Sequence, residues 1–170
     1  MTFRLFVVPL LVSLLLPSMA EAAKRHPPPD VVDDALAYAA TDRRKAIVLL
    51  EGALADGVSE TDIDIIELHA GEQQRLAGDL DAAHEHFRAI VQRLRKGSDR
   101  EAARLGLALV AASKSLDANT VDVLNDVSDK DGLPSQNADK YLAFTVLAAP
   151  EGDASAVQEN ARKAMSFASE

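Results

Sequence analysis

The apolar residues of this chain recur every three or four positions from residue 30 onward, which is the spacing of helices with one buried face. Val31, Ala35 and Tyr38 share one face of a first helix, and Ala46 and Leu50 share a face of a second. No segment shows the alternation of apolar and polar residues that marks a half-buried strand. The pattern therefore predicts an all-α fold.

Turn and capping residues divide this pattern into eight predicted helices. Glycines, prolines and a capping acid mark several of the boundaries, at Gly57, Gly78, Gly97, Pro134, Pro150 and Asp153. Between them the pattern predicts a fifth helix over residues 99–113, opened by a capping box of Ser98 and Glu101, and a sixth over 118–127. Because most of the connections are short, neighbouring helices are expected to pair into four antiparallel hairpins.

The chain also contains a weak internal repeat. Apolar residues recur at an offset of 37 residues (68 − 31 = 37), and one such column is Val31, Leu68, Leu105 and Leu142. Repeats of this length are typical of stacked helical hairpins, in which each unit packs against its neighbours.

One segment resembles the second half of a tetratricopeptide repeat. Gly78 and Asp79 are followed by Ala83 and then by Phe87. In that family a Gly-Asp turn joins two helices, a small residue lets them approach, and an aromatic residue fills the gap between them. Gly71 matches the small residue that the first helix places against the second.

Gly152 and Asp153 begin a second copy of this pattern, and the resemblance extends over most of residues 30–168. The chain departs from the family pattern at Glu67 and Gln74, where large apolar residues are usual, and its period is 37 instead of roughly 34. The resemblance implies a right-handed α-solenoid of about four hairpins over residues 30–170. A generic all-α bundle is the alternative.

The resemblance also implies a binding groove lined by the first helix of each hairpin. The expected groove residues are Tyr38, Leu68, Glu72, Arg75, Leu105 and Leu109. We expect Tyr38, Glu72 and Arg75 to be exposed there, whereas the leucines fit either the groove or the core. The function implied is a non-catalytic adaptor that binds a peptide or a partner helix. The alternative is a compact helical bundle that binds a small ligand or self-associates.

Residues 1–22 have the pattern of a secretion signal. An arginine precedes an apolar run over residues 5–16, and small residues allow cleavage after Ala20 or Ala22. A membrane anchor is the alternative, but a spanning helix needs about 20 apolar residues and this run is shorter. A proline-rich spacer follows over residues 23–29. We therefore expect an exported protein, periplasmic or secreted, whose mature chain does not span a membrane.

Composition narrows the chemistry of the mature domain. The chain has no cysteine, which excludes disulfide scaffolds, thiolate metal sites and cysteine nucleophiles. Its formal net charge of −9 disfavours nucleic acid as a partner, and the basic run over 88–96 is better explained by the end of a helix. The expected partner is a protein or peptide of the cell envelope.

The remaining polar residues give little support to catalysis or metal binding. His84 and His86 are two positions apart on a helix, so their side chains diverge. His69 and Glu72 can face one ligand but lack a third partner. Clustered carboxylates lie at helix starts and turns, and motifs for nucleotide binding or a nucleophilic serine are absent from the sequence. We expect no enzyme activity, no metal and no cofactor.

Overall fold

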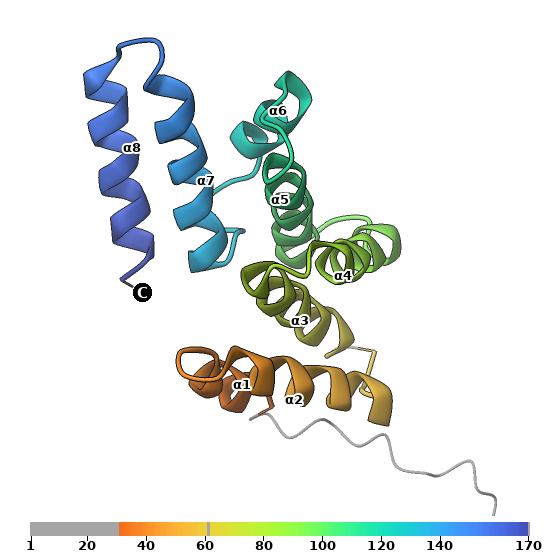
Figure 1. The fold of residues 1–170 in the computed structure, drawn as a ribbon. Helices are drawn as coiled ribbons and strands as arrows, with labels where there is room; N and C mark the ends of the chain where they lie inside the picture. The colour runs from red at the N-terminus through yellow and green to blue at the C-terminus, as the bar shows by residue number, and fades with distance from the viewer. Residues whose placement is uncertain (1–30, 61, 170) are drawn as a thin grey trace, which may run out of the picture.

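A computed structural model describes residues 31–60 and 62–169, and these ranges contain eight α-helices and no strand (Figure 1). The predicted all-α fold and the predicted number of helices are thereby confirmed. The predicted signal segment 1–22 and spacer 23–29 lie outside the described residues. The helices are α1 (Val31–Ala39), α2 (Arg43–Asp56), α3 (Ile63–Ala77), α4 (Leu80–Arg93), α5 (Ser98–Ala112), α6 (Ala118–Asp126), α7 (Pro134–Ala148) and α8 (Ala154–Phe167).

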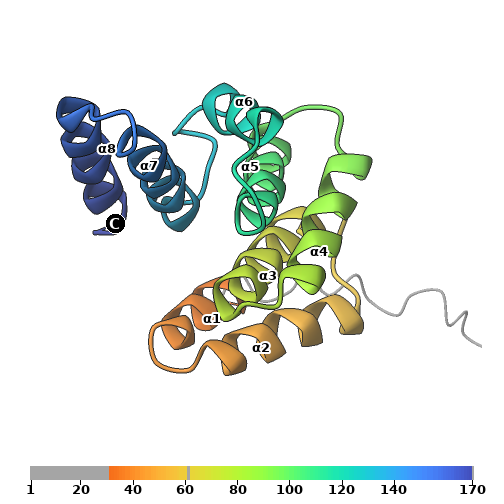
Figure 2. The same ribbon diagram turned by 45° about the horizontal axis from the view of Figure 1, so that its top comes forward.

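The helices pack mainly against their neighbours in the chain. Consecutive helices are in contact from α1 to α6, and α7 packs against α8 as a final hairpin (Figures 1 and 2). A second set of contacts joins alternate helices, α1 to α3, α3 to α5 and α5 to α7. The odd-numbered helices therefore form one connected layer. In the part of the chain that the structure describes, none of the helices is long and apolar enough to cross a membrane.

Two turns of the chain are built alike. Gly78 ends α3 at φ 86° and Gly152 precedes α8 at φ 73°, in the left-handed region that favours glycine. Each is followed by an aspartate, Asp79 or Asp153, whose side chain accepts a hydrogen bond from the backbone N–H three residues later. The same glycine and aspartate thus precede α4 and α8, although α3 ends directly at Gly78 and α7 ends earlier, at Ala148.

The centre of the fold is the Phe87 side chain, which is fully buried between α3 and α5. A methyl group added at Gly71 of α3 would lie 2.9 Å from the ring atom Cε1. One added at Gly106 of α5 would lie 2.6 Å from Cε2 and Cζ, on the other edge of the ring. The ring occupies space that only glycine leaves free on the two flanking helices.

The predicted capping box at the start of α5 is wrong. Ser98 is the first helical residue, Gly97 stands at the cap position with φ 118°, and no side chain caps the helix. The Ser98 hydroxyl donates instead to Asp99, at 3.5 Å, and Glu101 forms ion pairs with neighbouring arginines. The helix begins one residue earlier than predicted. Ser98 is therefore inside the helix and not at the cap position that a capping box requires.

The contacts of Phe87 predict that Gly106→Ala destabilises the fold. We expect a loss of about 1–3 kcal/mol in the free energy of unfolding, because the added methyl group overpacks a rigid ring. Unfolding in urea, followed by circular dichroism, measures this change.

Gly52→Ala is the matched control, since Gly52 is exposed within α2 and an added methyl group there meets nothing within 4 Å. It should stabilise the protein by up to about 1 kcal/mol through helix propensity. Equal effects of the two substitutions would contradict the packing described for Phe87.

Candidate functional site

The three leucines expected near the groove are core residues. Leu68 is 3% exposed, Leu105 is fully buried and Leu109 is 6% exposed. Leu68 packs with Phe87, whereas Leu105 and Leu109 belong to a cluster between α5 and α6. Tyr38 behaves differently, since it is exposed on α1 and the Lys45 Nζ lies 3.4 Å from the centre of its ring.

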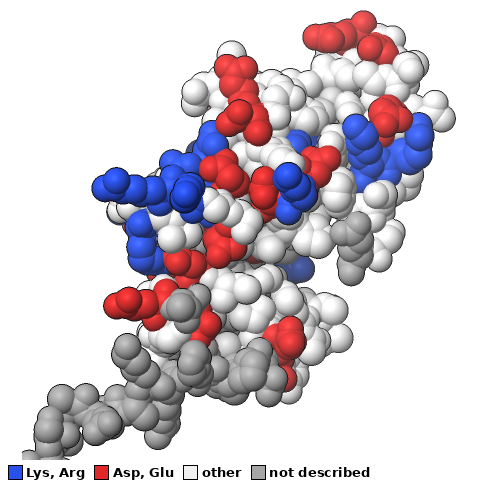
Figure 3. All heavy atoms as spheres, turned by 180° about the vertical axis from the view of Figure 1, so that it is seen from behind, with Lys and Arg blue, Asp and Glu red and all other residues white. Residues whose placement is uncertain are grey.

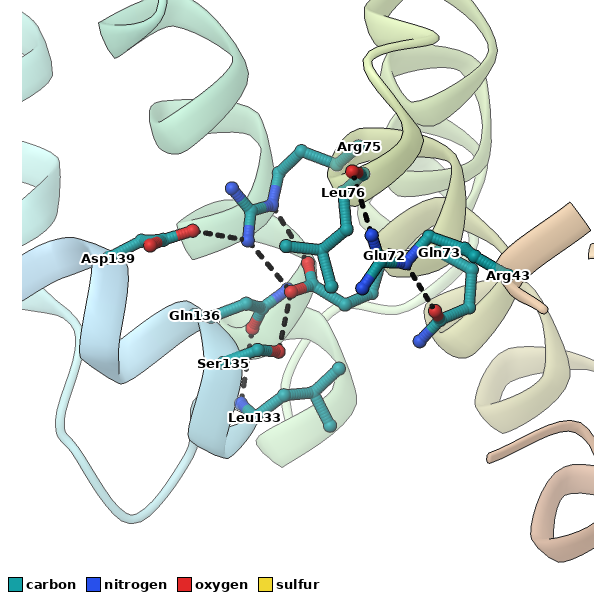
Figure 4. Close-up of polar contacts among 9 residues, drawn as sticks. All are labelled: Arg43, Glu72, Gln73, Arg75, Leu76, Leu133, Ser135, Gln136 and Asp139. Carbon is teal, nitrogen blue, oxygen red and sulfur yellow. Dashed lines mark hydrogen bonds and ion pairs between the residues drawn. The ribbon is translucent and has the colours of Figure 1, made fainter. Parts of the chain in front are cut away.

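The expectation that Glu72 and Arg75 are exposed is wrong. Glu72 is 1% exposed and the Arg75 side chain is 9% exposed. The reason is that α7 lies against this part of α3 and contributes Ser135 and Asp139 to the same contact (Figure 4). We refer to Glu72, Arg75, Ser135 and Asp139 as the α3–α7 ion-pair network.

Within this network every charge has a partner. Arg75 donates from Nε to the Glu72 Oε2 at 2.9 Å and from Nη2 to Oε1 at 2.8 Å, a bidentate pair. The Arg75 Nη2 also lies 2.7 Å from the Asp139 Oδ2, and the Ser135 hydroxyl donates to the Glu72 Oε1 at 2.5 Å. Burial by itself would lower the pKa of Arg75, but Glu72 and Asp139 together raise it above its ordinary value. Arg75 therefore stays charged, and Glu72 serves as a structural acceptor.

A pocket of about 620 Å³ lies beside this network, between α1, α3, the start of α7 and the end of α8. This volume is in the range of pockets that hold ligands or anchoring side chains. All four segments contribute to its apolar wall, which includes Leu36, Leu76, Leu133, Ala138 and Phe167. Leu36 is 41% exposed, so part of the wall faces solvent.

Arg43 forms one polar edge of the pocket. Its Nε donates to the Gln73 Oε1 at 3.3 Å, and its Nη1 donates to the Leu76 carbonyl at 3.2 Å (Figure 4). The second contact satisfies a carbonyl in the last turn of α3, which has no partner within the helix. Both acceptors are neutral, unlike the carboxylates around Arg75.

His69 forms a second polar edge. Burial lowers the pKa of its imidazole from the ordinary 6.5, and the charges of Glu72 and Asp99 offset only part of this effect. The neutral form of His69 is therefore favoured near neutral pH. Elsewhere in residues 31–60 and 62–169, histidines and carboxylates nowhere gather in threes that could hold a metal ion.

Part of the basic run at the end of α4 is paired with acids, and Arg88 there pairs with Glu85. Arg93 pairs with Asp64, at 2.5 Å, and with Glu67, both of α3. In the same region Arg104 pairs with Glu101 and Asp126. Figure 3 shows Lys and Arg side chains lying among Asp and Glu side chains on the face opposite to that of Figure 1.

Sequence reasoning did not find Leu36, Arg43 or Phe167 as pocket residues. Arg43 did carry a signal, because a cation in the first turn of a helix opposes the helix dipole. Leu36 and Phe167 are far apart in the chain and carry no such signal. The chain matches no known family model, no curated protein and no solved structure.

The α3–α7 ion-pair network predicts a large effect of Glu72→Gln. We expect a loss of about 2–4 kcal/mol in the free energy of unfolding, because the buried Arg75 keeps only one of its two carboxylate partners. Denaturant unfolding of the variant measures the loss.

Glu85→Gln is the control, since Glu85 and Arg88 have the same i,i+3 spacing but are 62% and 53% exposed. It should change the free energy of unfolding by less than about 1 kcal/mol. A similarly small change for Glu72→Gln would show that the buried network adds nothing to stability.

The lowered pKa of His69 predicts a dependence of stability on pH. The folded state binds this proton less readily than the unfolded state, so the stabilisation is complete above the ordinary pKa of 6.5 and is lost as the pH falls below it. His69→Gln should remove this component between about pH 7 and pH 5. Imidazole titration by NMR gives the pKa directly.

Asp99→Asn should lower the pKa of His69 further, because Asp99 is one of the charges that raise it. A measured pKa for His69 at or above 6.5 in the folded protein would be the opposite of this expectation.

Proposed function

We propose that this protein is a non-catalytic adaptor of about four tetratricopeptide-like hairpins. It binds a peptide or a partner helix in the pocket between α1, α3, α7 and α8. After removal of residues 1–22 it acts as a periplasmic or secreted protein, within a complex of the cell envelope.

Three features of the fold support the tetratricopeptide-like arrangement. In both Gly78-Asp79 and Gly152-Asp153 the glycine has a positive φ and the aspartate caps the following helix. Phe87 fills the gap beside Gly71, as the family pattern requires. The odd-numbered helices contact one another in series, as the first helices of stacked hairpins do.

The observation that carries the binding proposal is the partly apolar pocket on the layer of odd-numbered helices. In stacked hairpins that layer lines the concave surface used for binding. Leu36, which lines the pocket, is 41% exposed on α1, so the pocket wall continues onto the surface of the protein. Tyr38 is also exposed on α1 but does not line the pocket.

An apolar strip on α7 favours an extended partner over a small ligand. Ser135, Asp139, Leu142 and Val146 lie on one face of α7 by their spacing, and the first two border the pocket. Leu142 is 51% exposed and Val146 is 62% exposed. The surface available to a partner thus continues from the pocket along the helix.

The proposal predicts that Leu36→Glu strongly reduces partner capture. The mature chain, immobilised and incubated with envelope extract, should retain its partner, whereas the variant should retain about tenfold less, since burial of a leucine contributes about 1.5–3 kcal/mol. Quantitative mass spectrometry of the eluates measures the yield.

Val48→Glu is the matched control, because Val48 is 63% exposed on α2 and does not line the pocket. It should leave capture unchanged. Equal capture by all three proteins would contradict the proposed binding surface, and a small molecule released from the unfolded protein would instead favour the compact-bundle alternative.

A further inference from the structure

The start of α2 carries an unusual set of charges for so acidic a chain. The net charge is −9, yet α2 begins with Arg43, Arg44 and Lys45 in succession. Cations at this end of a helix oppose its dipole and weaken it slightly. Among the described residues none of the three forms an ion pair with a carboxylate, and the Asp42 side chain accepts the backbone N–H of Lys45 instead.

The three cations have different surroundings. Lys45 lies over the Tyr38 ring, and Arg44 is exposed and does not line the pocket. Arg43 alone reaches the pocket, where Gln73 and the Leu76 carbonyl fix its guanidinium. These contacts use two of its five N–H groups, which leaves three for another acceptor.

The unmatched charge limits what can fill the pocket. Arg43 is exposed and lines the pocket beside Leu36 and Leu76, so an apolar partner that packs on these walls covers part of its guanidinium. A guanidinium that loses water without gaining an anion is unfavourable, whereas a carboxylate can pair with its free N–H groups in bidentate geometry. Arg75, close by, cannot take this role because Glu72 and Asp139 already neutralise it.

We infer that the segment bound in the pocket presents an aspartate or glutamate side chain to Arg43, next to a large apolar side chain. The apolar side chain packs on Leu36, Leu76 and Phe167. This inference rests on the proposed function and adds the chemistry of the partner to it.

Two blocked tripeptides test the inference without knowledge of the partner. Acetyl-Leu-Glu-Leu-amide and acetyl-Leu-Gln-Leu-amide differ only in the side-chain charge, and each is titrated into the labelled mature chain while amide shifts are followed by NMR. The Glu peptide should shift the amides of Leu36, Gln73 and Leu76 and bind about tenfold more tightly than the Gln peptide. Added salt should reduce the difference.

Substitutions at two neighbouring positions identify the anchor. Arg43→Gln should abolish the preference for the Glu peptide, Arg43→Lys should keep part of it, and Arg44→Gln should leave it unchanged. Thermal unfolding of each variant checks that the fold is intact.

The outcomes separate this inference from the proposed function. Equal binding of the two peptides, no binding of either, or an unchanged preference in Arg43→Gln would overturn the inference. Partner capture that depends on Leu36 but not on Arg43 would also overturn it, while leaving the proposed function in place.

Discussion

The buried guanidinium of Arg75, bound by Glu72 of the same helix and by Asp139 of α7, is the contact on which the pocket depends. It joins α3 to a helix more than sixty residues later, and Ser135 adds a further bond across the same junction. Because a buried charge is tolerated only with its partners in place, α7 is held in one position against α3. That position brings the final hairpin opposite α1 and leaves the pocket between them.

The spacing between α3, which carries Glu72 and Arg75, and α5 is determined by the packing of Phe87. The Phe87 ring lies between Gly71 and Gly106, so α3 and α5 are spaced by the width of one aromatic ring. Since interiors are close-packed, a side chain on either glycine would displace the helices that carry it. The position of Glu72 and Arg75 follows from that spacing, because Glu72 is the residue after Gly71 on α3 and Arg75 lies one turn further along.

Much of the helical fold was readable from local chemistry. Gly57 and Gly78 end their helices, and Asp153 caps α8, as the sequence predicted. These effects depend on the conformation and hydrogen bonds of a few adjacent residues, so a single sequence reveals them. The capping box predicted at Ser98 is wrong because the helix starts one residue earlier, and a sequence alone does not fix a helix boundary to a single residue.

The candidate site was predicted only in part. Glu72 and Arg75 were predicted as exposed groove residues, but the sequence does not show that Asp139 and Ser135 cover them. Arg43 was not predicted as a site residue, because its partners Gln73 and Leu76 belong to another helix. Such contacts require knowledge of which helix faces lie together, and apolar periodicity gives the buried face of a helix without naming its partner.

By itself the sequence determined an all-α chain of eight helices, because helical periodicity and capping depend on residues within one or two turns of each other. Tertiary structure alone decided which residues on the odd-numbered helices are core and which border solvent. It placed Leu68 in the core and Leu36 at the pocket, although both lie on apolar helix faces. The physical reason is that burial and charge pairing are set by distant segments brought together in space, and the pairing of Arg75 but not of Arg43 with carboxylates follows from that arrangement.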